Sequence, residues 1–246
     1  MRRVTVATVC VLALLVAVAL LARRDSSSRR VPPLGYVELV TGSPAEPGES
    51  LPIVLGIHGL GDTPELFLRT FASEMPARVR MILPRAPTAY GDGFSWFEIL
   101  GTSLAGEGFA DGVIEAGERV ATLIDTLTRD LHPPSPPIVF GYSQGGILSY
   151  YLAAKHPTAI AAALPIAGLL PPSLGPSAAP AATFAYHGAR DELVPIDAAR
   201  TTVASFRAAG GVAELREYPH LGHAISLALV RDVQAKLAEV LSASVK

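Results

Sequence analysis

Short apolar runs that alternate with longer helical patterns constrain the fold of this chain more than any other feature. Runs such as Ile53–Ile57, Ile138–Phe140 and Ala161–Ile166 are apolar throughout, instead of alternately apolar and polar. Continuous runs are typical of strands that helices cover on both faces, and therefore of a parallel sheet. The alternation predicts an α/β architecture with a mostly parallel, doubly wound sheet and helices on both faces.

The expected elements fill most of the chain after residue 35. The expected strands are Tyr36–Val40, Ile53–Ile57, Val79–Leu83, Ile138–Phe140, Ala161–Ile166, Thr183–Tyr186 and Ala213–Tyr218. The expected helices are Glu65–Met75, Phe109–Leu131, Gly145–Lys155, Asp197–Ala209 and Ala224–Ala243. The turn-rich residues 41–50 separate the first strand from the second, so this strand suits an antiparallel addition at the sheet edge. The proline-rich residues 169–180 form a loop long enough to border a site.

The first thirty residues differ in composition from the rest of the chain. Residues 4–22 carry no charge and are flanked by arginines, and these nineteen residues suit a membrane-spanning helix or a signal-peptide core. Arg23 and Arg24 favour an uncleaved anchor, whereas Ala17 and Ala19 suit signal cleavage. We therefore expect an apolar helix and a basic tether over residues 1–30, and a catalytic domain over residues 31–246. The protein is then either anchored at a membrane or exported.

Composition excludes several classes of function. Residues 1–30 hold six arginines and one acidic residue, which leaves 14 basic and 21 acidic residues in the remainder. That remainder offers no basic face, so we expect no nucleic-acid partner. The only cysteine, Cys10, lies in the N-terminal apolar run, so the globular part has no thiol nucleophile. Histidines and carboxylates lack the spacing of a metal site, so no metal is expected.

The stretch VFGYSQGGILSY, residues 139–150, places a serine where an expected strand turns into an expected helix. Ser143 lies between Gly141 and Gly145 in a G-x-S-x-G pattern. Such a turn strains the backbone of the serine, and glycine on either side avoids clashes. The turn lifts the serine oxygen above the sheet edge as a nucleophile. The pattern alone also fits an incidental serine in a strand-to-helix turn. The presence or absence of the other catalytic groups has to distinguish these two interpretations.

A serine nucleophile needs a general base, and six histidines are available. The stretch PHLGHAIS, residues 219–226, follows the last expected strand, where this architecture places the base. His223 opens the last expected helix and is the better candidate, while His220 is interpreted as structural. His58 is expected to brace an early loop.

The base needs a carboxylate that fixes its tautomer. Asp191 follows an apolar strand at the edge where Ser143 is expected. The adjacent Glu192 would point elsewhere, and Asp197 reads as an acidic residue at a helix N-terminus. The order Ser143, Asp191, His223 is that of α/β-hydrolases.

The oxyanion that forms during acyl transfer needs hydrogen-bond donors. One is the backbone N–H of Gln144, the residue after the nucleophile. The second is expected from the loop at residues 57–65, where Gly59 and Gly61 let the backbone turn inward and Leu60 supplies the N–H. One such donor stabilises the transition state by roughly 3 kcal/mol.

Six motifs together resemble the phospholipase/carboxylesterase family, which includes the acyl-protein thioesterases. They are HGLGDT, PRAPT, SWFEI, GYSQGG, HGARDELVP and GHAIS, and they span about residues 50–240 in the order of that family. The resemblance implies an α/β-hydrolase fold and a cofactor-free serine hydrolase of carboxylic esters or thioesters. By position it implies the triad Ser143, Asp191 and His223, and the oxyanion donors Leu60 and Gln144. It also implies that Trp96 is an aromatic residue beside the acyl site.

Residues 84–109 form a long, aromatic-rich excursion between a strand and a helix. Phe94, Trp96 and Phe97 are expected to line a pocket for an apolar acyl or aryl group. An alternative is that they pack as the core of a lid. No strong cationic clamp for a phosphate headgroup accompanies them.

These residues predict hydrolysis of a small-molecule or lipid-like ester. Two alternatives stay open: an acyltransferase that uses the same triad with an alcohol as acceptor, and a catalytically silent, membrane-tethered binding module.

Overall fold

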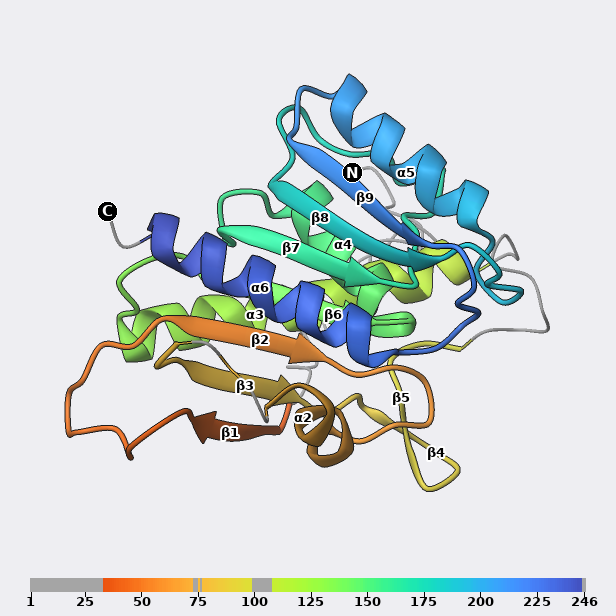
Figure 1. Cartoon of the computed structure of the whole chain (residues 1–246). Coiled ribbons are helices and arrows are strands. Elements are labelled where there is room, and N and C mark those ends of the chain that lie inside the picture. The colour runs from red at the N-terminus through yellow and green to blue at the C-terminus, as the bar shows by residue number, and fades with distance from the viewer. Residues whose placement is uncertain (1–32, 73–74, 76, 99–107, 245–246) are drawn as a thin grey trace, which may run out of the picture. The chain divides into compact units, whose positions relative to one another are not determined.

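The computed structural model describes residues 33–72, 75, 77–98 and 108–244 (Figure 1). The expected apolar helix, whether anchor or signal, lies outside these residues. Within the described ranges no helix is both long and apolar enough to cross a membrane. Met1–Pro33 and Leu34–Lys246 separate as two units, and the fold below is that of the second.

The second unit alternates strands and helices as expected, with one hairpin inserted. The strands are β1 (Tyr36–Val40), β2 (Ile53–Ile57), β3 (Arg80–Pro84), β4 (Thr88–Tyr90), β5 (Gly93–Ser95), β6 (Ile138–Tyr142), β7 (Ala162–Ile166), β8 (Ala182–Gly188) and β9 (Ala213–Tyr218). The helices are α2 (Pro64–Ala72), α3 (Phe109–Leu131), α4 (Gln144–Lys155), α5 (Ile196–Ala208) and α6 (Leu227–Ser244).

Seven strands form one sheet in the order β1-β3-β2-β6-β7-β8-β9. All neighbours pair in parallel except β1, which pairs antiparallel with β3 at the edge. The predicted antiparallel edge strand is therefore confirmed. Strand β6 lies near the middle of the sheet, between β2 and β7 (Figure 1). Its carboxyl end meets those of its parallel neighbours at one edge, where ligands of such sheets bind.

Helices cover both faces of the sheet, and a separate hydrophobic core lies under each layer of helices. Helices α2 and α6 pack on one face, where Phe67, Phe71 and Val233 are fully or almost fully buried (Figure 1). Helices α3, α4 and α5 pack on the other, with Val120 and Phe206 in the second core. This double cover explains why β2 and β7 are buried at every position and apolar throughout.

Most bounds differ from the expectations by one to three residues, and α2 ends at Ala72 in place of Met75. Two further local features also differ. The excursion after β3 contains a two-stranded hairpin of β4 and β5, which an isolated bridge between Asp62 and Phe94 joins to the loop after β2. Three-residue strands give too short a pattern to detect. Helix α6 begins at Leu227 instead of Ala224, because the Ser226 hydroxyl accepts a hydrogen bond from the Leu229 N–H at 3.2 Å and so caps the helix.

Candidate active site

Ser143 occupies the turn between β6 and α4 with φ 55° and ψ −114°. A positive φ is uncommon for a residue other than glycine, and such strain persists only where the surroundings enforce it. Here the Ser143 N–H donates to the Ile166 carbonyl at 2.9 Å, and the Ser143 carbonyl accepts from the Ile147 N–H at 2.9 Å. The backbone is therefore held from β7 on one side and from α4 on the other.

The glycines around Ser143 allow α4 to approach the sheet closely. A Cβ atom on Gly141 would lie 2.3 Å from the Gly145 carbonyl oxygen, and one on Gly145 would lie 1.9 Å from that of Ile57. A Cβ atom on Gly146 would lie 2.4 Å from the Ile166 oxygen. Real Cβ atoms do not approach this closely, so these glycines are required by backbone contact, as expected for the two that flank the serine.

His223 lies within hydrogen-bond distance of both the serine and an acid. Its Nε2 is 2.9 Å from Ser143 Oγ, and its Nδ1 is 2.8 Å from Asp191 Oδ2. With a carboxylate at Nδ1, this nitrogen carries the proton and Nε2 is free to accept one from the serine. His223 does not open the last helix as expected. It lies in the loop before α6, because Ser226 starts that helix later.

Asp191 is held in the ionised form. Burial by itself raises the pKa of its carboxyl group, but hydrogen bonds from His187, His223 and the Val194 N–H outweigh burial and hold the pKa below its ordinary value. Oδ1 accepts from the N–H groups of Leu193 at 3.0 Å and Val194 at 2.8 Å. The second oxygen, Oδ2, contacts His223 Nδ1, so hydrogen bonds to both oxygens hold the carboxylate beside the imidazole.

Tyr142 also holds His223 in place. Its hydroxyl donates to the His223 carbonyl oxygen at 2.9 Å, and the two ring centroids are 5.1 Å apart. Burial, with the charges of Asp191 and Asp62, raises the pKa of the tyrosine to about 12, so the hydroxyl keeps its proton. Sequence reasoning did not select this residue. A buried tyrosine hydroxyl that needs a partner is the signal that could have found it.

The loop after β2 lies against the nucleophile. A Cβ atom on Gly59 would lie 3.4 Å from Ser143 Cβ and 3.1 Å from the Tyr142 ring, which places Gly59 beside the serine. Leu60 follows with its side chain exposed. In the described part of the chain, the backbone N–H groups of Leu60 and Gln144 donate to no backbone carbonyl.

His58 braces this loop, as expected. It is fully buried, its Nδ1 donates to the Gly59 carbonyl at 2.7 Å, and its Nε2 accepts from the Ala86 N–H at 3.2 Å. This pattern requires the neutral ring. Burial also favours the neutral ring, because burial lowers the pKa of His58. The hydrogen bond to Gly59 raises this pKa, but by less.

The model of the Phospholipase/Carboxylesterase family matches residues 40–241. The chain belongs to this family. A probable carboxylesterase from Oryza sativa subsp. japonica is 29% identical over 232 residues, which cover 87% of this chain and 87% of that protein. Acyl-protein thioesterase 1 from Mycosarcoma maydis is 27% identical over 216 residues, 76% of this chain and 90% of that protein.

Solved structures confirm the α/β-hydrolase fold. The crystal structure of esterase PE8 matches with a TM-score of 0.73 at 21% identity, over 85% of this chain and 100% of that chain. Family membership and the curated relatives make this protein a serine esterase.

The aromatic residue that the family resemblance places beside the acyl site is buried in this esterase. Trp96 is 4% exposed and Phe97 6% exposed, and both belong to the core under α3 and α4. The Gln144 side chain fixes this segment, because its Oε1 accepts from the Trp96 N–H at 2.9 Å and its Nε2 donates to the Phe97 carbonyl at 2.8 Å. Phe94 is only half-buried. That these three line the acyl pocket stays a prediction, and sequence reasoning missed the clamp by Gln144.

Other candidate groups of the esterase lie away from the triad. His156 Nε2 contacts Glu118 Oε1 at 2.8 Å, and His220 is exposed. No group of three metal-ligating side chains that could hold an ion occurs among the residues that the structure describes.

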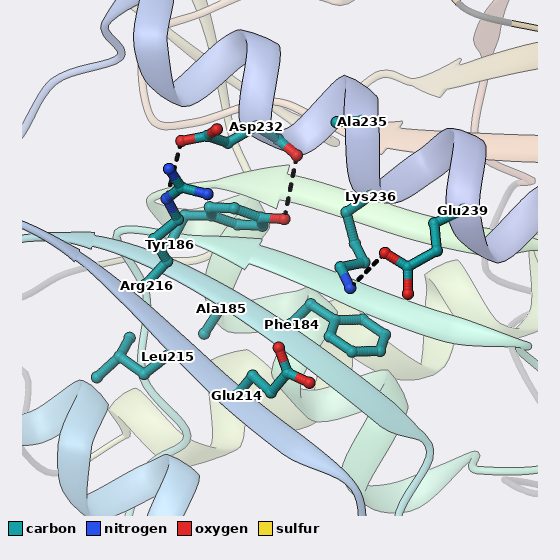
Figure 2. A pocket seen from close by; sticks show the side chains of 10 residues that line it. All are labelled: Phe184, Ala185, Tyr186, Glu214, Leu215, Arg216, Asp232, Ala235, Lys236 and Glu239. Atoms are coloured by element: carbon teal, nitrogen blue, oxygen red, sulfur yellow. Dashed lines mark hydrogen bonds and ion pairs between the residues drawn. The ribbon is translucent and has the colours of Figure 1, made fainter.

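A hollow of about 330 Å³ lies between α6 and strands β8 and β9 (Figure 2). Its charged groups are largely paired: Arg216 with Asp232 at 2.9 Å, and Lys236 with Glu239 at 2.7 Å. The Lys236 ammonium also lies 4.4 Å from the centroid of the Phe184 ring. The first pair joins β9 to α6, whereas Lys236 and Glu239 both belong to α6. None of the expected site residues lines this hollow.

Proposed function

We propose that this protein hydrolyses carboxylic esters or thioesters through an acyl-enzyme on Ser143. The observation that carries the proposal is the continuous chain of contacts from Ser143 Oγ through both nitrogens of His223 to Asp191. Each group stands in the role that nucleophilic catalysis requires: a hydroxyl, a base within reach, and a carboxylate that orients the base.

Acylation begins when Ser143 Oγ attacks the carbonyl carbon and its proton passes to His223 Nε2. The tetrahedral intermediate carries a negative oxygen, for which the N–H groups of Leu60 and Gln144 are the proposed donors. The intermediate collapses, the bond to the leaving oxygen or sulfur breaks, and His223 gives its proton to that atom.

Deacylation repeats these steps with water as nucleophile. His223 takes a proton from water, the new bond forms at the acyl carbon, and the Ser143 oxygen leaves and recovers its proton. Asp191 stays ionised throughout and stabilises the imidazolium that forms in both halves. The carboxylic acid then departs and the free enzyme returns.

A fluorophosphonate probe tests the nucleophile directly. We expect the wild-type protein to be labelled and to hydrolyse p-nitrophenyl acetate, and Ser143→Ala to do neither. The matched control is Ser173→Ala, an exposed serine in the loop after β7, which should behave as wild type. A folded wild-type protein that is neither labelled nor active would contradict the proposal and leave the silent binding module as the better account.

Transfer of the acyl group to an alcohol would use the same triad. Product analysis with p-nitrophenyl acetate and added butanol separates the two outcomes, because hydrolysis yields acetate and transfer yields butyl acetate. No residue of the described site favours an alcohol over water, so hydrolysis is the proposed reaction.

We further propose that residues 1–30 attach this esterase to a membrane or direct its export. Support comes from the uncharged apolar residues 4–22 and the arginines around them. Fractionation of cells that express the full chain, followed by mass spectrometry of its N-terminus, tests both alternatives. Recovery of the full-length protein in the cellular fraction that is free of membranes would contradict both membrane attachment and export.

A further inference from the structure

Strand β9 forms one edge of the sheet, and its outer side is unpaired. It follows β8 as the last strand in the sheet order, and no described strand lies beyond it (Figure 1). An edge of this kind presents a row of backbone N–H and C=O groups that can pair with a strand of another chain. Which strand fits depends on the groups that point outward and on the side chains beside them.

Leu215 and Glu217 turn their backbone groups to the outer side. The Tyr218 carbonyl accepts a hydrogen bond at 2.9 Å from the backbone that continues β8, so Tyr218 faces inward. Backbone groups of successive residues point to opposite sides of a strand, which turns the odd-numbered residues of β9 outward. The Ala213 carbonyl agrees with this direction, because it accepts from Arg207 Nε of α5 at 2.7 Å and not from β8.

The side chains of β9 on the α6 face are complementary to themselves. In order they are Val212, Glu214, Arg216 and Tyr218, because every second residue shares a face. When two β9 strands pair antiparallel about Leu215, Glu214 of each strand lies opposite Arg216 of the other. Val212, which is 61% exposed, then lies opposite the Tyr218 ring. Ion pairs and aromatic pairs with β-branched residues both stabilise antiparallel strands.

The α5 face matches in the same register. Pairing about Leu215 places Glu217 of each strand opposite Ala213 of the other, whose carbonyl binds Arg207. Glu217 already accepts from Arg200 of its own chain at 2.6 Å. In the pair it would lie near a second arginine, so acid meets base on this face as well.

Other registers lack this match. Centring the pair on Glu214, Arg216 or Glu217 places two like charges directly opposite each other, which destabilises antiparallel strands. The charge pattern therefore selects Leu215 as the centre.

Arg216 has donors left for a second acid. Its Nε lies 2.9 Å from Asp232 Oδ2 of α6, yet its side chain stays 61% exposed (Figure 2). A guanidinium group carries five N–H donors, so those that Asp232 does not use can bind Glu214 of a second chain.

We propose that two copies of this chain pair antiparallel through β9, about a two-fold axis at Leu215, and join their seven-stranded sheets into one continuous sheet. The same surface serves both copies, so the contact closes as a dimer. The paired strands run in opposite directions, so the carboxyl edges of the two sheets, and with them the two triads, lie at opposite ends of the dimer. The inference does not depend on the proposed reaction.

Charge reversal tests the contact in the full chain, purified in detergent and followed by sedimentation velocity at micromolar concentration. We expect a dimeric wild type. Glu214→Arg and Arg216→Glu each place like charges opposite each other and should raise the dissociation constant of the dimer roughly tenfold or more. An equimolar mixture of the two variants should restore the dimer, because one chain then presents two arginines and the other two glutamates.

The matched control is Glu115→Arg, the same substitution at an exposed position of α3, which should stay dimeric. All variants should keep the wild-type kcat/KM for p-nitrophenyl acetate, which shows that they are folded. A monomeric wild type overturns the proposal. Dimers that persist in both single variants, or a mixture that stays monomeric, also overturn it, because the contact would then lie elsewhere.

A cysteine at the centre tests the register. In a Cys10→Ser background, which removes the only native thiol, Leu215→Cys should form a disulfide-linked dimer on mild oxidation. The two Cα atoms at such a position are about 5.5 Å apart, within the range for disulfides. Ala204→Cys, exposed on α5, should stay uncrosslinked. Absence of the Leu215→Cys crosslink, or equal crosslinking of both variants, would overturn the proposed pairing.

Discussion

Two side chains hold His223, and only one of them is an acid. Asp191 accepts from the Nδ1 of the ring, while Tyr142 donates to the backbone carbonyl and its ring centroid lies 5.1 Å from that of the imidazole. The loop from Leu221 to Ser226 has no regular secondary structure of its own. At the scale of single residues, the position of the base therefore depends on both contacts.

Replacing Tyr142 with phenylalanine removes the hydroxyl and keeps the ring. A hydrogen bond of this kind contributes about 1 kcal/mol, so we expect kcat to fall about fivefold with KM little changed. Steady-state kinetics with p-nitrophenyl acetate measures this. The matched control is Tyr218→Phe, which removes a hydroxyl bonded to Asp232 Oδ2 at 2.7 Å, away from the triad. Equal kinetics in both variants would show that Tyr142 has a structural role alone.

The ionisation of Asp191 makes the free energy of unfolding depend on pH in a predictable direction. Its pKa in the folded protein lies below the unfolded value of about 3.9, because the hydrogen bonds to the carboxylate outweigh burial. The carboxylate thus stabilises the fold fully above about pH 5, and this contribution is lost as pH falls through the folded pKa. In urea unfolding we expect wild type to be more stable than Asp191→Asn at pH 7, and the difference to shrink toward pH 3. A difference that grows on acidification would contradict this assignment.

At the scale of elements, backbone contacts at two glycines constrain how closely helix α4 packs on the sheet. Gly145 lies against the end of β2 and Gly146 against β7, with carbonyl oxygens closer than a side chain permits. The helix can approach the sheet this closely only because both positions lack a Cβ atom. Its N-terminus then directly follows Ser143.

Gly145→Ala should separate α4 from β2. Because the obstacle is the backbone oxygen of Ile57, no side-chain rotation relieves the contact. We expect a loss of about 3 kcal/mol or more in the free energy of unfolding. Gly35→Ala is the control, since nothing lies within 4 Å of its added methyl group. Urea denaturation of both variants measures the difference, and similar stabilities would show that the helix tolerates displacement.

On the scale of the whole molecule, the catalytic fold is contained in the unit from Leu34 to Lys246. This unit includes both cores, the seven-stranded sheet and the proposed triad. We expect a protein that starts at Leu34 to fold with the thermal midpoint and the kcat/KM of the full chain on a water-soluble ester. Differential scanning fluorimetry and kinetics check this, and an insoluble product would show that the first 33 residues contribute to folding.

Apart from the β4–β5 hairpin, the order of strands and helices could be predicted from the sequence, as could the antiparallel edge strand and the strained turn at Ser143. These follow from local periodicity and from the steric needs of neighbouring residues, which a linear pattern records. It also indicated Asp191 and His223, because their places after β8 and β9 bring them to the same sheet edge as β6.

The exact contacts between segments that are distant in the chain could be read only from the folded structure. Ser143 and His223 are 80 residues apart, and their hydrogen bond depends on how two loops close over the sheet edge. The hydroxyl of Tyr142, the amide of Gln144 and the burial of Trp96 also depend on partners that no local pattern identifies. Side-chain packing in three dimensions sets these distances, so these contacts could be found only in the folded protein.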